Sequence, residues 1–151
     1  MQPSFQFCPD ALGGISNRSR VGIDIVQVSR IEESLRQFGD RFMSRLYSAA
    51  EIAYAKSAPP LTTRRLAARF AAKEATLKAL QLTDRGIDWR ELEVSRSPTG
   101  ECEMRLHGAA KRAAAEVGIR PIALSLTHEG DYAGAILIAE SSSSICNDSD
   151  T

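Results

Sequence analysis

The stretch TTRRLAARFAAKEATLKAL, residues 62–80, decides the fold of this 151-residue chain. Alanine is the best helix former, so this Ala-rich stretch predicts a long helix that ends near Leu80, with Thr62 or Thr63 as its N-cap. At about 100° per residue, one stripe of the helix is apolar and consists of Leu66, Phe70, Leu77 and Leu80. The helix therefore has a face that must pack against another layer.

Strand patterns on both sides of this helix supply that layer. Residues 21–26, VGIDIV, predict one buried strand. Residues 92–95 and 102–106 predict a hairpin around the turn 97–100, and residues 122–127 and 132–138 predict a second hairpin through 129–131.

Shorter helices fill the remaining segments. They are predicted at 29–38 with Ser29 as the cap, at 40–46, from the capping box Ser48–Glu51 to the break at Pro59-Pro60, and at 109–117. The order β, several α, ββ, α, ββ predicts an α+β fold with a mostly antiparallel sheet and one long helix packed on it.

Composition favours one globular domain, because 43% of the residues are hydrophobic and 25% are charged. We expect this domain to span residues 19–140, between a flexible N-terminal extension (1–18) and a disordered Ser-rich tail (141–151). The sequence has no uncharged apolar run of about 18 residues or more, so we expect no membrane helix. Three distant cysteines without a CxxC pair argue against a disulfide framework or a zinc site and favour the cytoplasm.

Charge is balanced overall but not along the chain. Nineteen basic and nineteen acidic residues cancel, yet residues 18–78 hold twelve basic and six acidic ones. This cationic half favours an anionic ligand or an acidic partner protein, although such a split also arises without function. Nucleic acid fits less well, because basic residues are not interleaved with aromatic ones.

Polar residues at three places are unusual for the predicted elements in which, or next to which, they lie. Asp24 lies inside an apolar strand, so it either serves a metal ion or catalysis, or it lies at the strand end and faces water. On the long helix, Lys73 lies within the apolar stripe and Glu74 at its edge, with Lys78 one turn beyond Glu74. A simple interpretation is that Lys73 extends to solvent and that Glu74 and Lys78 form an exposed ion pair. The third position, His128, follows a strand directly and is either a turn residue or a ligand.

Two separated carboxylates suit a hard cation such as Mg²⁺, with water and phosphate oxygens as the remaining ligands. Ser125 and Thr127 share one strand face, but no Gly-x-Ser-x-Gly motif surrounds them, so Ser/His hydrolase chemistry is unsupported. His107 and Trp89 are interpreted as structural residues.

Taken together, these positions resemble the small stand-alone 4′-phosphopantetheinyl transferases, the holo-[acyl-carrier-protein] synthases. The motifs that carry the resemblance are, in chain order, GID at 22–24, SRI at 29–31, RFAAKEA at 69–75, KAL at 78–80 and SLTH at 125–128. The resemblance covers residues 20–140, and the combination of the first motif with Phe-x-x-Lys-Glu-Ala-x-x-Lys is fairly specific.

The resemblance implies Mg²⁺-dependent transfer of the phosphopantetheine arm from coenzyme A to a serine of an apo acyl carrier protein, with release of 3′,5′-ADP. As in the family, Asp24 and Glu74 would hold Mg²⁺, and Glu74, directly or through a water, would take the serine proton. Lys78 would donate to or hold the leaving phosphate, and Arg69 and His128 would face coenzyme A phosphates.

The resemblance also implies partners. Arg30, on the first helix, matches a residue that meets the acidic carrier protein, which accounts for the cationic half. Family members of this length assemble as homotrimers with sites between chains. Two segments depart from the family pattern: QLTDRG at 81–86 replaces a glycine-rich turn, and SPTGE at 97–101 replaces a Gly-Lys-Pro hairpin. The alternatives are a Mg²⁺-dependent nucleotide phosphohydrolase and a non-catalytic paralogue that binds a carrier protein.

Overall fold

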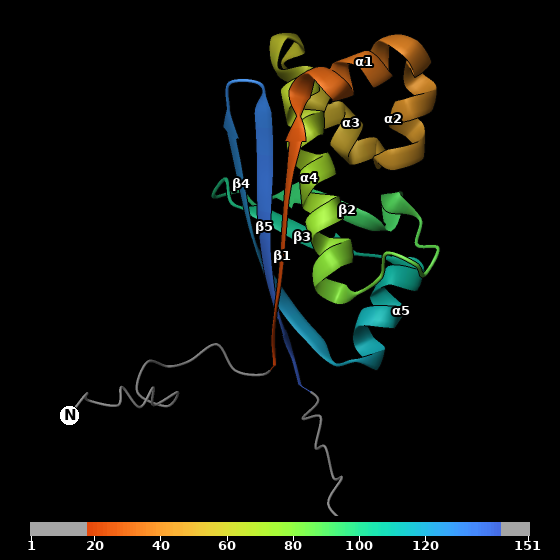
Figure 1. The fold of residues 1–151 in the computed structure, drawn as a ribbon, viewed down its shortest axis with the longest axis vertical. Coiled ribbons are helices and arrows are strands. Elements are labelled where there is room, and N and C mark those ends of the chain that lie inside the picture. The colour runs from red at the N-terminus through yellow and green to blue at the C-terminus, as the bar shows by residue number, and fades with distance from the viewer. Residues whose placement is uncertain (1–17, 143–151) are drawn as a thin grey trace, which may run out of the picture.

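The computed structural model describes residues 18–142, and at its centre the helix α4 (Thr62–Leu80) lies across an antiparallel sheet (Figure 1). The strands of this sheet are β1 (Ser19–Gln27), β5 (Tyr132–Ser141) and β4 (Ile119–Glu129), in that spatial order. The predicted α+β fold, with antiparallel pairing and one long helix on the sheet, is confirmed.

The smaller elements also follow the predicted order. Helices α1, α2 and α3 gather at one end of the sheet, and the hairpin β2–β3 forms a two-stranded sheet of its own (Figure 1). Their bounds are α1 Val28–Phe38, α2 Asp40–Leu46, α3 Ala49–Lys56, β2 Leu92–Arg96, β3 Cys102–Leu106 and α5 Gly108–Glu116, with short 3₁₀ turns at Pro59–Leu61 and Trp89–Glu91.

A missing side chain lets α4 approach the sheet closely. A Cβ atom at Gly22 would collide with the carbonyl oxygen of Ala75, so β1 needs glycine where the helix crosses it. Side chains alternate along a strand, and Asp24 therefore lies on the same face as Gly22 and points toward α4. Ile23 and Ile25 lie on the opposite, outer face of the sheet.

A buried ion pair fixes the rotation of α4. Lys73 is fully buried, and its Nζ donates to Glu51 Oε2 at 2.8 Å and to the carbonyl oxygens of Trp89 and Leu92 at 2.8 and 2.6 Å. Glu51 Oε1 accepts a hydrogen bond from the backbone N–H of Val94 at 2.9 Å. Burial lowers the pKa of Lys73, and the charge of Glu51 opposes this shift. The expectation that Lys73 extends to solvent is wrong, because its donors are satisfied inside the protein.

Helix caps agree with the sequence in one case and differ in two. The capping box Ser48–Glu51 is confirmed at the start of α3. Ser29 lies inside α1 instead of capping it, and its N–H and Oγ–H donate to the carboxylate of Asp131 at 2.9 and 2.6 Å. Thr62 is the first residue of α4, and its hydroxyl donates to the carbonyl oxygen of Ala55 at 3.1 Å. The cap of α1 thus comes from the β4–β5 turn, which is distant in sequence.

The described chain reaches slightly beyond the predicted domain. Strand β5 continues to Ser141, whose N–H donates to the carbonyl oxygen of Arg18 at 2.8 Å. The rest of the predicted extensions, 1–17 and 143–151, lies outside the described residues. Between residues 18 and 142, the helices are too short or too polar to cross a membrane.

Candidate active site

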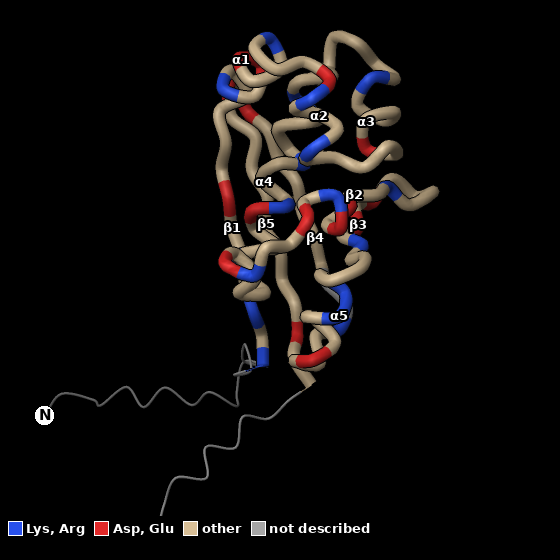
Figure 2. Tube along the Cα trace, turned by 90° about the vertical axis from the view of Figure 1, so that its right-hand side faces the viewer, with Lys and Arg blue, Asp and Glu red and all other residues tan. Residues whose placement is uncertain are grey.

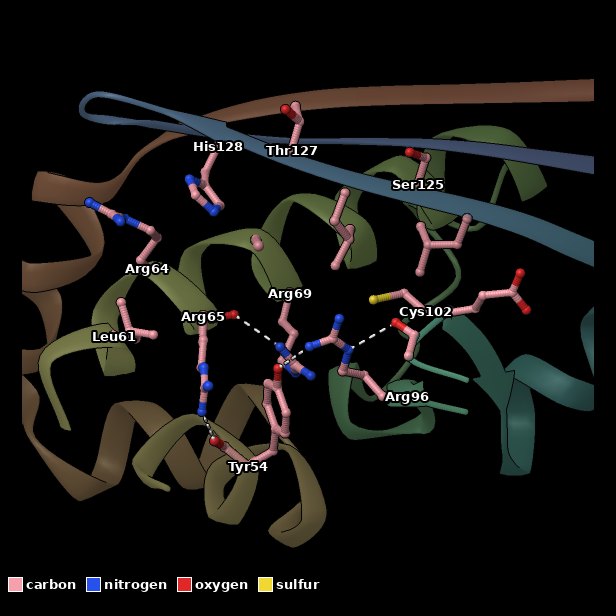
Figure 3. A pocket seen from close by; sticks show the side chains of 15 residues that line it. Tyr54, Leu61, Arg64, Arg65, Arg69, Arg96, Cys102, Ser125, Thr127 and His128 are labelled. Atoms are coloured by element: carbon pink, nitrogen blue, oxygen red, sulfur yellow. Dashed lines mark hydrogen bonds between the residues drawn. The ribbon is translucent and has the colours of Figure 1, made fainter. Parts of the chain in front are cut away.

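Of the predicted site residues, all but Lys78 line one of two pockets on different sides of α4. A cavity of about 900 Å³, here called the carboxylate pocket, is lined by Asp24, Arg30 and Glu74 among others. A second cavity of about 500 Å³, the arginine pocket, includes Arg69 and His128 (Figure 3). Arg69 and Glu74 are five positions apart on α4, a rotation of about 140° beyond a full turn, so the two side chains leave α4 in different directions.

Lys78 does not line the carboxylate pocket itself, but it pairs with Asp24 of that pocket and not with Glu74. Its Nζ donates to Asp24 Oδ1 at 2.8 Å and to the carbonyl oxygen of Ile23 at 3.2 Å. The Asp24 side chain is 17% exposed and that of Lys78 50%. The prediction of an exposed ion pair between Glu74 and Lys78 along the helix is therefore wrong, because Lys78 instead joins α4 to β1.

Glu74 is electrostatically coupled to Asp24. Burial and the charge of Asp24 raise the pKa of Glu74, while the charge of Lys78 acts in the opposite direction. Two carboxylates that repel each other in one pocket suit a hard divalent cation, which would relieve this repulsion. Within residues 18–142, no cluster of three or more His, Cys, Asp or Glu could hold a metal ion. A cation here would thus use these two carboxylates and take its other ligands from water or substrate.

The arginine pocket is strongly basic. Its lining includes Arg64, Arg65, Arg69 and Arg96, with His128 pointing from β4 toward them (Figure 3). Arg69 is only 3% exposed, and burial lowers its pKa. Its Nη1 donates to the carbonyl oxygen of Arg65 at 3.4 Å, but its buried Nε has no hydrogen-bond partner among the described residues. This pocket is suited to an anion that supplies the missing acceptor.

The sequence patterns did not identify one aromatic and three basic members of the arginine pocket, namely Tyr54, Arg64, Arg65 and Arg96. Arg65 lies one helical turn before Arg69, so the helical spacing contained a signal for it. Tyr54 on α3 and Arg96 on β2 are brought in by tertiary packing, and no local pattern indicates them. Cys102, free and half-buried, also lines this pocket.

The other residues singled out in the sequence are Ser125, Thr127, Trp89 and His107. Ser125 and Thr127 project from the other side of β4 relative to His128 (Figure 3). Trp89 packs on Phe70, with 5.0 Å between the ring centroids. His107 precedes α5. Neither Trp89 nor His107 lines the carboxylate pocket or the arginine pocket.

Arg30 lies exposed on α1 and lines the carboxylate pocket. Figure 2 shows further basic residues at the helical end of the molecule formed by α1, α2 and α3. The hydrogen bonds from Ser29 to Asp131 hold the first turn of α1 next to the β4–β5 turn. Arg30 is thus presented to solvent from an anchored helix.

Comparison with known proteins agrees with the resemblance of the motifs. Residues 20–137 match the family model of the 4′-phosphopantetheinyl transferase superfamily. The holo-[acyl-carrier-protein] synthase of Koribacter versatilis is 47% identical over 120 residues, covering 79% of this chain and 95% of the relative. The enzyme of the same name from Solibacter usitatus is 42% identical over 120 residues, with the same coverage.

Solved structures agree with both the fold and the family. A Chronobacterium ammoniagenes ACPS–CoA complex has a TM-score of 0.73 at 29% identity, covering 83% of this chain and 98% of that one. The Helicobacter pylori holo-[acyl-carrier-protein] synthase in complex with coenzyme A has a TM-score of 0.70 at 29% identity, covering 80% and 99%. Since the family model spans most of the chain and the relatives match over nearly their whole length, this chain belongs to the 4′-phosphopantetheinyl transferase superfamily and is an enzyme of that class.

Proposed function

We propose that this enzyme is a holo-[acyl-carrier-protein] synthase. It transfers the 4′-phosphopantetheine arm of coenzyme A to a serine of an apo acyl carrier protein and releases 3′,5′-ADP. The observation that carries the proposal is the meeting of Asp24 and Glu74 in one pocket, with Lys78 held on Asp24 at 2.8 Å. Phosphoryl transfer depends mainly on positioning and on charge stabilisation, and these three groups can supply both.

Each of the three side chains has a role in this reaction. Asp24 and Glu74 would hold Mg²⁺, which when bound neutralises charge on the coenzyme A pyrophosphate. Glu74, directly or through a water, accepts the proton of the serine as the serine oxygen forms its bond to the β-phosphorus. Lys78 donates a hydrogen bond to the phosphate oxygen of 3′,5′-ADP as the bond between phosphorus and that oxygen breaks.

The complete site, in this proposal, forms between chains of a homotrimer. Asp24 and Arg69 serve the same substrate but lie in pockets on different sides of α4, so a neighbouring chain would have to join them. The outer face of the sheet supports self-association, because Ile23 and Ile25 are 60% and 66% exposed and Ile23 pairs with the exposed Ile136 of β5. A continuous apolar patch of this kind is rare on a monomer, and we assign it to contacts with further copies of this chain.

The acyl carrier protein would dock on α1. Exposed Arg30 lies beside the carboxylate pocket, and the basic residues of the helical end attract an acidic partner (Figure 2). We expect the enzyme to act in the cytoplasm, with the carrier protein of fatty acid synthesis as the first substrate to test.

The test is incubation of the full chain with coenzyme A, Mg²⁺ and a panel of apo carrier proteins. Mass spectrometry should detect a carrier protein heavier by one phosphopantetheine arm and an equal amount of 3′,5′-ADP. A nucleotide phosphohydrolase would instead cleave coenzyme A without a carrier protein. A non-catalytic paralogue would bind the carrier protein and leave both substrates unchanged.

A further inference from the structure

Three arginines from two elements surround a single aromatic ring in the arginine pocket. The guanidinium carbons of Arg65 and Arg69, both on α4, lie 4.4 and 4.2 Å from the centroid of the Tyr54 ring. Arg96 on β2 lies 5.9 Å from the same centroid, and its Nη1 donates to Tyr54 Oη at 2.8 Å (Figure 3). Tyr54 on α3 thus contacts all three guanidinium groups.

The three guanidinium groups keep their positive charge unneutralised. Within residues 18–142, none of them forms an ion pair. Arg65 donates to the carbonyl oxygen of Tyr54 at 2.7 Å and to Ser57 Oγ at 2.8 Å, and Arg96 donates its Nε to the carbonyl oxygen of Gly100 at 3.1 Å. All these acceptors are neutral. The exposed carboxylate of Glu101 lines the same pocket without pairing with these arginines.

The Tyr54 ring holds the three arginine side chains close together. Like charges repel, and the negative face of an aromatic ring attracts guanidinium groups without cancelling their charge. An acidic residue in place of Tyr54 would pair with the arginines and reduce the positive field in the pocket. The buried Nε of Arg69, which lacks a partner among the described residues, leaves one donor for an incoming anion. The cluster is therefore organised before any ligand binds.

We propose that Tyr54 is a positioning residue that holds Arg65, Arg69 and Arg96 as one binding site for a phosphate group, and that Arg96 is a phosphate-binding residue. The ligand class is a nucleotide phosphate monoester. This inference rests on the proposed function, because it takes the nucleotide to be the 3′,5′-ADP part of coenzyme A.

The experiment measures binding of 3′,5′-ADP to the full chain by isothermal titration calorimetry at low salt. Tyr54→Phe keeps the ring but removes the acceptor of Arg96, and we expect Kd to rise about three- to tenfold. Tyr54→Leu also removes the ring face, and Arg96→Gln removes one guanidinium; we expect each to raise Kd about tenfold or more. The matched control is Arg105→Gln on β3, whose guanidinium contacts Glu103 outside the pocket and whose loss should leave Kd unchanged.

A second readout separates positioning from a purely structural role. Tyr54→Phe should raise KM for coenzyme A and leave KM for the carrier protein unchanged, with an unaltered circular dichroism spectrum. Wild-type affinity in both Tyr54→Phe and Arg96→Gln would overturn the inference, even if the enzyme modifies carrier protein normally. If Tyr54→Leu does not fold, these two variants decide the outcome.

Inorganic pyrophosphate serves as the comparison ligand. Wild-type protein that binds pyrophosphate but not 3′,5′-ADP would overturn the nucleotide assignment. Failure of the proposed function is a separate result, in which no carrier protein gains mass although 3′,5′-ADP binds in a Tyr54-dependent manner.

Discussion

The ammonium group of Lys78 lies 2.8 Å from a carboxylate oxygen of Asp24, and this contact joins the last turns of α4 to the middle of β1. It places a positive charge beside the two carboxylates that are proposed to hold a cation. Lys78 and a divalent cation should therefore compete for Asp24.

Lys78→Met should tighten binding of Mn²⁺, used as a spectroscopic substitute for Mg²⁺, because it removes a charge that repels the cation. The ion pair is half exposed, so we expect an increase in affinity of about two- to fivefold. Electron paramagnetic resonance of free Mn²⁺, without coenzyme A, measures this directly. Lys111→Met, which removes an exposed lysine of α5, is the control. Weaker Mn²⁺ binding in Lys78→Met would contradict competition.

Glu74→Gln should raise the stability of the protein at neutral pH while removing transferase activity. The pKa of Glu74 is raised above its ordinary value of 4.5, so the folded state binds this proton more tightly than the unfolded chain does. Stability therefore falls as pH rises from 4.5 through the folded pKa, and the neutral amide avoids this loss. Urea unfolding at several pH values should show a difference between variant and wild type that shrinks toward acid pH. Glu116→Gln on α5 serves as the surface control, and an activity of Glu74→Gln near wild type would refute the assigned role.

Asp24→Ala and Arg69→Ala should each lack activity alone and recover it when mixed and reassembled. If one site takes Asp24 from one chain and Arg69 from a neighbour, random mixing at equal amounts leaves about a quarter of the sites intact. Asp24→Ala mixed with Glu74→Gln is the control, because both residues line the same pocket and no intact site can form. Light scattering should give about three times the mass of one chain. No recovery in the first mixture would place the complete site within one chain.

Gly22→Ala should destabilise the protein by about 1–3 kcal/mol or more, because the added methyl group meets the Ala75 carbonyl oxygen at the crossing of β1 and α4. Activity should fall as well, since a displaced α4 would carry Lys78 away from Asp24. Gly134→Ala is the matched control on β5, where the nearest atom is the Thr127 methyl group at 3.3 Å. Equal free energies of unfolding for the two variants would show that the close approach is not what requires glycine.

Arg30→Glu should raise KM for the carrier protein far more than KM for coenzyme A. The wild-type KM for the carrier protein should also rise with salt, because exposed charges are screened beyond about 10 Å at 0.1 M ionic strength. Arg112→Glu on α5 makes the same charge change away from α1. Equal effects of Arg30→Glu on the KM values of both substrates would assign Arg30 to the binding of coenzyme A or to general stability.

Local patterns predicted the order of elements and both hairpins, because strand alternation, turn residues and the capping box Ser48–Glu51 act over a few residues. Tertiary partners were not predictable in this way. Nothing near Lys73 indicates the buried Glu51 that receives it, and nothing near Ser29 indicates Asp131. Helical spacing identified Glu74 and Lys78 as neighbours, whereas the structure pairs Lys78 with a strand residue 54 positions away.

The same limit explains the two pockets. The motifs identified four candidate site residues, Asp24, Glu74, Arg69 and His128. Their division between two pockets depends on the strand order β1–β5–β4, which no local pattern predicts. Arg96 could not be predicted from its neighbours in the sequence, because its partner Tyr54 lies 42 positions earlier on α3.

The hydrogen bonds from Ser29 to Asp131 connect the two surfaces that are proposed to bind the substrates, α1 for the carrier protein and the arginine pocket for coenzyme A. Asp131 follows β4, three residues after His128, and both its carboxylate oxygens accept hydrogen bonds from Ser29. A carrier protein that tilts α1 would therefore pull on the hairpin that bears His128. Changes at Asp131 would loosen this linkage, so they should disturb the handling of both substrates at once.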